Sequence, residues 1–191
     1  RELRTFGEAE DRCDELERAL HGQERTEAAY KQTRDFVREL DAFILSLEWE
    51  AVELKEFSYK KISLTEDEIS AFFYEKLCDV PIFSRMDKIA EYVIDALETL
   101  QDKDMEEEEQ LLIHEKLRKM YRTTNCLDLY NLFLLESARE EQQIADGTIP
   151  YDDVYPLLYL KYATEGMTRH RMVKHLVIDE MQDYSYLQYR I

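Results

Sequence analysis

The chain has 191 residues, of which 45% are hydrophobic and 12% aromatic, so it can bury a core and does not have the composition of a disordered tail. Its formal net charge is -18, and a surface of that sign repels a phosphate backbone, which argues against a stand-alone nucleic-acid-binding protein. With only 4 Gly and 3 Pro the chain has few turn-forming residues, which predicts a mainly α fold with long helices.

The cysteines and the amino end bear on the compartment. Cys13, Cys78 and Cys126 lie far apart and form no CxxC pair, which indicates a reducing, cytoplasmic setting and argues against a zinc site. No apolar run approaches the roughly 20 residues of a membrane span, and the charged amino end does not resemble a signal peptide. Because the chain opens on Arg1 rather than Met, we expect it to be part of something longer.

Residues 1–60 are predicted to form a long helical arm. Apolar residues recur there in steps of three and four, at Leu16, Leu20, Phe36, Leu40, Phe43, Ile44 and Leu47. This spacing predicts one or two long amphipathic helices with a break near Gly22. A helix of that length projects from a small domain, so we expect this arm to be available for coiled-coil pairing with another helix.

Residues 61–146 are predicted to form a second, helical segment. Thr65 with Glu68 three residues later has the spacing of a capping box and predicts a helix start, and Pro81 can open the next helix. A charged link over 101–109 leads into a helix predicted over 105–121. The Thr123–Asn125 break then precedes a strongly apolar helix that holds Leu127, Leu129, Tyr130, Leu132, Phe133 and Leu134.

Residues 147–191 are predicted to form a third segment. Its helix is expected to be capped by Asp152 or Asp153 and ended by Gly166, and Ser185 can cap a last helix. A basic patch contains Arg169, Arg171 and Lys174, and it is either a phosphate or DNA contact or a solvated approach to the next element. The apolar run Leu176–Ile178 is the only segment that we predict to be a β-strand.

Three carboxylates and an amide follow that predicted strand, in the order Asp179, Glu180, Gln182, Asp183. An Asp at the carboxyl end of a buried strand can hold a magnesium ion beside a nucleotide, and a Glu beside it can take the proton of an attacking water. Gln182 is then a candidate sensor of the terminal phosphate or of the water, and Asp183 a candidate to hold a neighbouring loop. The alternative is a buried strand followed by solvated acids.

The segment Val177–Asp183 resembles the Walker B box of superfamily-one helicases of the UvrD/Rep type, in which the order D-E-x-Q-D is usual. Met181 stands where that family commonly has Ala. The stretch from Ile149 to Leu160 is similar to the helix that precedes the box in these proteins, and Ser185 and Gln188 also fit. The helical stretch from Ile62 to Ser137 most resembles the HelD branch, whose members are helicase-like ATPases that release RNA polymerase from nucleic acid.

This resemblance implies a helical insertion subdomain over 61–146 and a partial RecA-like α/β domain over 147–191, with the strand belonging to that incomplete domain. It also implies ATP and magnesium as cofactors of the intact parent, Asp179 as the metal ligand, Asp179 and Gln182 at the nucleotide, and Glu180 with Gln182 in catalysis. The parent's partners would be DNA and, in the HelD branch, RNA polymerase.

The 191 residues contain no G-x-x-x-x-G-K-[ST] loop to cradle phosphates, so we expect this chain alone to be inactive and to bind no cofactor tightly. The competing hypothesis is an acidic helical module that works by protein contact, for example an arm that meets RNA polymerase, without catalysis of its own. Its acidity favours a partner with a basic surface. A free-standing acidic coiled coil fits less well, because the aromatic-rich helices after residue 64 lack a heptad pattern.

Overall fold

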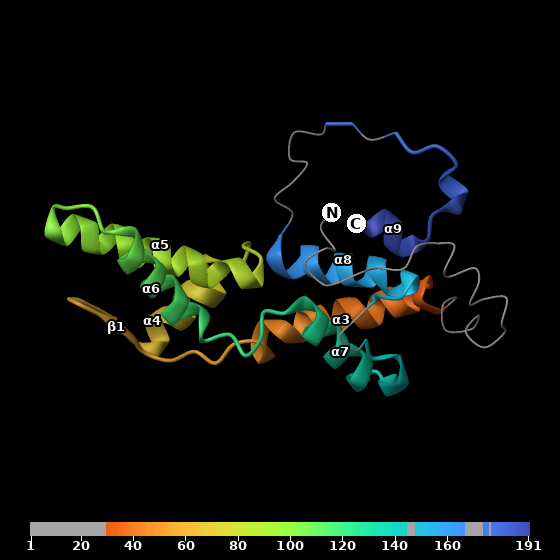
Figure 1. Ribbon diagram of the computed structural model, residues 1–191, viewed down its shortest axis with the longest axis horizontal. Coiled ribbons are helices and arrows are strands. Elements are labelled where there is room, and N and C mark those ends of the chain that lie inside the picture. The colour runs from red at the N-terminus through yellow and green to blue at the C-terminus, as the bar shows by residue number, and fades with distance from the viewer. Residues whose placement is uncertain (1–29, 145–147, 167–173, 176) are drawn as a thin grey trace. The chain divides into compact units, whose positions relative to one another are not determined.

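The computed structural model describes residues 30–144, 148–166, 174–175 and 177–191 (Figure 1). These residues are mainly helical, as the scarcity of Gly and Pro predicts. The described residues divide into two compact units. The first unit comprises residues 30–46, 125–144, 148–163, 174–175 and 177–191, and the second comprises residues 47–124 and 164–166. The three predicted segments, 1–60, 61–146 and 147–191, stay predictions.

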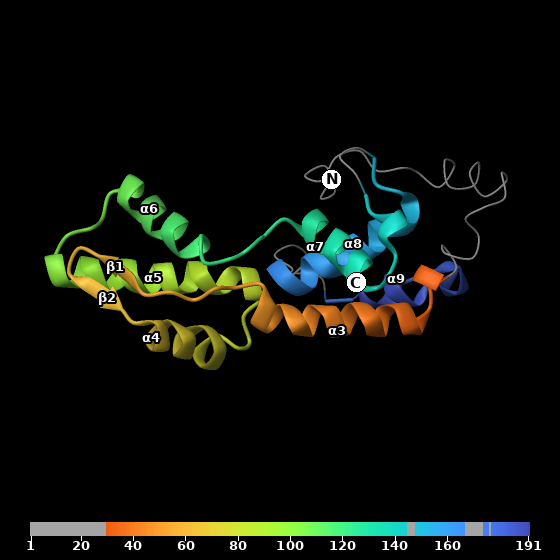
Figure 2. The same cartoon turned by 90° about the horizontal axis from the view of Figure 1, so that it is seen from below.

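The first unit is built on the helices α3 (Arg34–Glu50), α7 (Cys126–Glu136) and α8 (Tyr151–Glu165). The last residues of α3 and of α8 belong to the second unit. Its core is aromatic and aliphatic: the rings of Phe36 and Phe133 meet edge to face at 5.6 Å, and Phe43 lies 5.5 Å from Phe133. Burying such rings supplies most of the stabilisation available to a unit this small. Figure 2 shows the short carboxyl-terminal helix α9 (Tyr186–Arg190) in the same unit.

The second unit is centred on α5 (Ile82–Gln101), which packs along α6 (Glu107–Arg118) (Figures 1 and 2). Apolar positions three and four residues apart on α5 are fully buried, including Met86, Ile89 and Val93. Pro81 precedes α5 as predicted, here as the N-cap residue. Tyr121 closes the packing between the helices: its hydroxyl donates to the Ile82 carbonyl and accepts from the Met86 N–H at 3.3 Å.

The predicted capping box at Thr65 is confirmed. The Thr65 hydroxyl accepts from the Glu68 N–H at 3.3 Å, and the Glu68 carboxylate accepts from the Thr65 N–H at 2.8 Å. These bonds satisfy orphan amides at the start of α4 (Glu66–Ser70) and hold the pKa of Glu68 below its usual range. Beyond α4 the helix widens into a π-helix, η2 (Ala71–Lys76), in which Leu77 donates to the Phe72 carbonyl.

The strand predicted over Leu176–Ile178 is wrong at the positions that the structure describes. His175, Val177 and Ile178 are not in a strand, and Val177 is 93% exposed. A lone strand leaves its N–H and C=O groups without a ladder, so an apolar run does not become a strand unless another strand lies beside it. Leu176 itself lies outside the described residues. The chain is therefore mainly α, but without the predicted strand of a RecA-like domain at these positions.

The described sheet is instead a hairpin that the sequence did not reveal. Strands β1 (Phe57–Tyr59) and β2 (Ile62–Leu64) pair antiparallel, with Phe57 opposite Leu64, and both of these side chains are buried. Lys60 makes the tight turn with φ 53°. Two-residue hairpin turns usually contain Asn or Gly, and Lys60–Lys61 contains neither, so the sequence did not indicate this turn.

No helix among the described residues is both long and apolar enough to cross a membrane.

Candidate functional site

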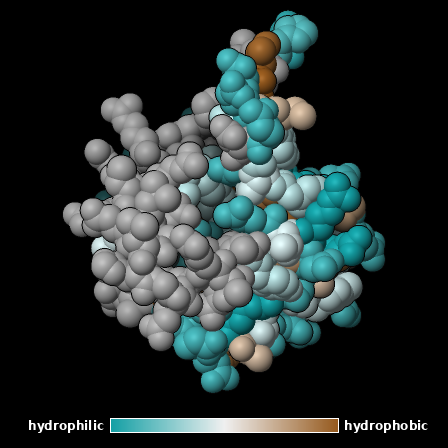
Figure 3. All heavy atoms as spheres, turned by 90° about the vertical axis from the view of Figure 1, so that its right-hand side faces the viewer, coloured by the Kyte–Doolittle hydropathy of each residue, from teal (hydrophilic) through white to brown (hydrophobic). Residues whose placement is uncertain are grey.

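A pocket of about 430 Å³ in the first unit contains two of the predicted site residues, Asp179 and Glu180. Its other lining residues come from the start of α8, from the turn before α3 and from the start of α9: Lys31, Gln32, Tyr151, Asp152, Tyr155, Pro156, Tyr184, Ser185, Leu187 and Gln188. The face shown in Figure 3 is mainly hydrophilic where its residues are described. The motif that stood out in the sequence therefore borders a cavity of ligand size.

The two acids are shaped by a local turn rather than by a strand end. Glu180 has a left-handed backbone (φ 50°), and its N–H donates to the Asp179 carboxylate at 2.9 Å. A short 3-10 turn, η4 (Met181–Asp183), follows. The Gln182 amide donates to the Glu180 carboxylate, so Glu180 and Gln182 are brought together. Asp179, Glu180 and Gln182 are all exposed, so solvent reaches each of their polar groups.

The carboxyl-terminal helix that frames this pocket is fixed by a predicted cap. The Ser185 hydroxyl accepts from the Gln188 N–H at 3.3 Å, and the Gln188 side chain accepts from the Ser185 N–H at 2.6 Å, which confirms Ser185 as the cap of α9. Leu187 is 2% exposed, and Arg190 donates to the Tyr159 hydroxyl at 2.8 Å. These contacts hold α9 against the first unit beside Asp179 and Glu180.

Lys31, which lines the pocket, belongs to a buried ion pair. The Lys31 ammonium lies 2.5 Å from the Asp153 carboxylate, which also accepts from the Tyr130 hydroxyl at 2.5 Å. All three side chains are at least nine-tenths buried. Burial, followed by the charge of Asp153, raises the pKa of the Tyr130 hydroxyl well above its ordinary value, so this group stays protonated and donates.

The Lys31–Asp153 pair shows that the predicted capping role of Asp153 is wrong, and it adds Lys31 to the residues of the candidate site. Neither Asp152 nor Asp153 caps α8: the helix starts at Tyr151, and the Asp153 N–H donates to the Pro150 carbonyl. The Asp153 side chain is drawn inward because the buried Lys31 ammonium needs a counter-charge. Sequence reasoning missed Lys31 altogether. No signal in the sequence pairs it with Asp153, which is 122 residues away.

The pocket is electronegative. The Lys31 charge is matched by Asp153, and Asp179 and Glu180 add two exposed carboxylates to the lining. An anionic triphosphate meets repulsion there unless a cation lies between, and Asp179 and Glu180 can supply carboxylate oxygens to a hydrated magnesium ion. Within the described ranges no group of three or more His, Cys, Asp or Glu side chains is placed to hold a metal. Asp179 and Glu180 are two carboxylates, so any cation bound there would need further ligands from water or from a bound molecule.

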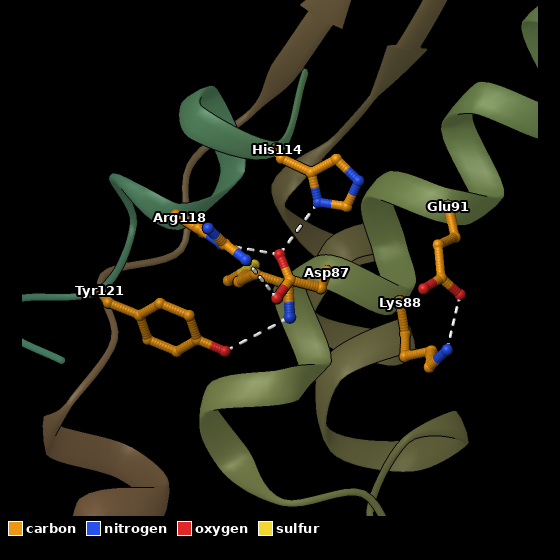
Figure 4. A network of polar contacts seen from close by, with 7 residues as sticks. Asp87, Lys88, Glu91, His114, Arg118 and Tyr121 are labelled. Carbon is orange, nitrogen blue, oxygen red and sulfur yellow. Dashed lines mark hydrogen bonds and ion pairs between the residues drawn. The ribbon is translucent and has the colours of Figure 1, made fainter. Parts of the chain in front are cut away.

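A second polar cluster lies in the second unit, between α5 and α6 (Figure 4). Arg118 binds both carboxylate oxygens of Asp87, at 2.7 and 2.8 Å, and the His114 ring lies 3.0 Å from the same carboxylate. Burial tends to raise the pKa of Asp87, but the bonds from Arg118 and His114 outweigh it, so the pKa lies below its ordinary value. Figure 4 shows these side chains turned toward one another between α5 and α6, where their polar contacts join the two helices.

Comparison of the chain with models of known families, with curated proteins and with solved structures found no match.

Proposed function

We propose that this chain is the part of a helicase-like ATPase of the UvrD/Rep type, in its HelD branch, that supplies the magnesium- and water-side acids of the nucleotide site. The observation that carries the proposal is that Asp179 and Glu180, singled out by their sequence order, both line one pocket. Their position after α8, with the Ser185-capped α9 next in the chain, is consistent with it.

The roles follow from the chemistry of the side chains. Asp179 binds magnesium-bound water or the ion itself, which positions the nucleotide phosphates when the rest of the site is present. Glu180 accepts the proton of the attacking water. Gln182, already bonded to Glu180, is suited to sense the water or the terminal phosphate and to move with Glu180. In this proposal the parent is a cytoplasmic protein that acts on DNA or on RNA polymerase, with residues 61–146 as its helical insertion and 1–60 as an arm.

Nucleotide binding by the protein encoded by the complete reading frame tests the proposal. With a fluorescent ATP analogue and magnesium, Asp179→Asn should weaken binding at least tenfold. Glu180→Gln should bind about as well as the unaltered protein, because Glu180 acts on water. Glu108→Gln, an equal change of charge at an exposed position of α6, is the matched control. Equal affinities of Asp179→Asn and Glu108→Gln would contradict the proposal.

The second candidate is an acidic interaction module, and it rests on a different observation. The chain carries a net charge of -18, and the exposed side chains near the α5–α6 turn combine carboxylates with Leu100, Leu111 and Leu112. Such a surface suits a basic protein partner. Retention of the 191-residue chain on bacterial core RNA polymerase at low salt, weakened by added salt, favours this function. No retention at low salt rules out polymerase as the partner.

A further inference from the structure

The only tryptophan of the chain is exposed at the edge of the second unit. Trp49, near the end of α3, is 70% exposed, and its ring stacks on Tyr74 with centroids 4.8 Å apart and planes 21° apart. Tyr74 comes from the π-helix η2, where its neighbour Phe73 is fully buried. The stack uses one face of the indole and leaves the other for a ligand. An exposed Trp ring stacked on a partly buried Tyr ring is typical of binding hot spots.

Carboxylates accompany both rings. Glu48 and Glu50 flank Trp49 in sequence, and Glu75 follows Tyr74. Glu48 is already matched, since its two oxygens lie 2.5 and 2.9 Å from the Arg85 guanidinium. Glu50 and Glu75 are exposed, and in the part of the chain that the structure describes neither pairs with a base. Glu50 and Glu75, which adjoin the two rings in sequence, therefore carry charges that have no basic partner among the described residues.

Within the protein itself, basic side chains contact a ring and a carboxylate together: Lys60 does so with Tyr59 and Glu109, and arginines do so more often. Three of its described arginines place the guanidinium over an aromatic ring and bond to a carboxylate as well. They are Arg85 over Phe73 with Glu48, Arg139 over Tyr30 with Glu39, and Arg190 over Tyr159 with Asp41. The ring-to-guanidinium distances are 5.1, 4.7 and 5.7 Å. The Trp49–Tyr74 stack supplies aromatic rings, and Glu50 and Glu75 next to them in sequence supply carboxylates, so an arginine from another molecule could complete the same combination.

We propose that the Trp49–Tyr74 surface, with Glu50 and Glu75, is a docking site for an arginine-bearing segment of a partner protein. Trp presents the strongest quadrupole of the aromatic side chains to a cation, and Arg is the less strongly hydrated base, so bringing Arg out of water onto a ring costs less than bringing Lys. The net charge of the chain argues against a nucleic-acid strand, whose bases would otherwise suit the exposed ring. This inference does not depend on the proposed ATPase function.

Because Trp49 is the sole tryptophan, its fluorescence reports on this surface alone when excited beyond the tyrosine band. The whole chain is titrated with a short arginine–glycine peptide, and separately with the same peptide carrying lysine. We expect saturable quenching with the arginine peptide and an affinity several times weaker for lysine. Tyr74→Leu and Glu75→Gln should each weaken arginine-peptide binding about two- to fivefold, and Glu108→Gln on α6 should not.

Each result that would contradict the docking proposal has a different meaning. Equal affinity for both peptides would show attraction by charge alone and overturn the proposal. Quenching by an oligothymidylate would instead assign the rings to nucleic acid. A fluorescence change that depends on protein concentration without peptide would show that a second copy covers Trp49. No saturable response to the arginine peptide would also overturn the proposal, and this arm needs no variant and so does not depend on a variant folding.

Discussion

The Lys31 ammonium lies 2.5 Å from the Asp153 carboxylate in the interior of the first unit, although 122 residues separate them in sequence. The pair joins the turn before α3 to the first turn of α8, and Tyr130 of α7 bonds to the same carboxylate. Three elements of the unit that carries Asp179 and Glu180 therefore meet at one buried charge pair.

Asp153→Asn should destabilise the first unit by about 3 kcal/mol, because it leaves the Lys31 charge buried without a counter-ion. Hydrogen exchange, followed peptide by peptide, should show faster exchange over α7 and α8. Asp35→Asn removes the same charge from an exposed pair with Arg38 in the same unit, and should cost less than about 0.5 kcal/mol. Equal effects of the two substitutions would mean that the Lys31–Asp153 pair does not organise the unit.

Gly166→Ala should destabilise the second unit. Gly166 has φ +83°, a conformation that costs a residue with a Cβ about 1–2 kcal/mol, and an added Cβ would lie 2.7 Å from Pro81 Cγ. Urea unfolding followed by Trp49 fluorescence measures the loss, since Trp49 belongs to this unit. Introducing the change together with Pro81→Ala should recover the part due to the contact. An unchanged unfolding midpoint in Gly166→Ala would mean that residue 166 does not need the positive φ described above.

Asp87→Asn should lower the stability of the second unit at neutral pH, because it breaks the bidentate bond to Arg118 and the contact with His114. The folded pKa of Asp87 lies below the ordinary value of 3.8, so its contribution is complete above pH 3.8 and disappears as pH falls through the folded pKa. The stability gap between variant and unaltered chain should therefore close in acid. Glu91→Gln, at an exposed pair with Lys88, should show little gap at any pH. A stability difference between Asp87→Asn and the unaltered chain that persists in strong acid would show that the ionised Asp87 carboxylate is not its cause.

The 191-residue chain on its own should not turn over ATP. It has the acids of the proposed site but no Gly-rich Lys loop to hold the phosphates. Phosphate release from magnesium-ATP should stay at the level of a Glu180→Gln control. Turnover clearly above that control would mean that the chain cradles the phosphates in a way that the sequence does not reveal.

Local signals in the sequence predicted local structure well. The Thr65–Glu68 and Ser185–Gln188 boxes are confirmed because a capping box involves only four consecutive residues. Gly166 ends α8 as predicted, for the same reason. The apolar spacing also predicted α5, whose buried face follows the helical period.

Features that depend on distant residues were missed or wrong. The Leu176–Ile178 run had the composition of a strand, but a strand forms only where another strand supplies hydrogen bonds. The Lys31–Asp153 pair depends on packing of the whole first unit, so Asp153 was predicted as a cap instead. Of the candidate site, Asp179 and Glu180 were identified from their order in the motif, whereas the pocket that they line could be found only in three dimensions.

ATP hydrolysis by the protein encoded by the complete reading frame, with Glu180→Gln compared with Glu108→Gln, tests whether Glu180 acts on the attacking water of a nucleotide site. If Glu180 takes the proton of the attacking water, Glu180→Gln should lower kcat by about 10²- to 10⁴-fold with little change in nucleotide affinity, while Glu108→Gln stays near the unaltered rate. Equal rates for the two variants would contradict the assignment of Asp179 and Glu180 to a nucleotide site.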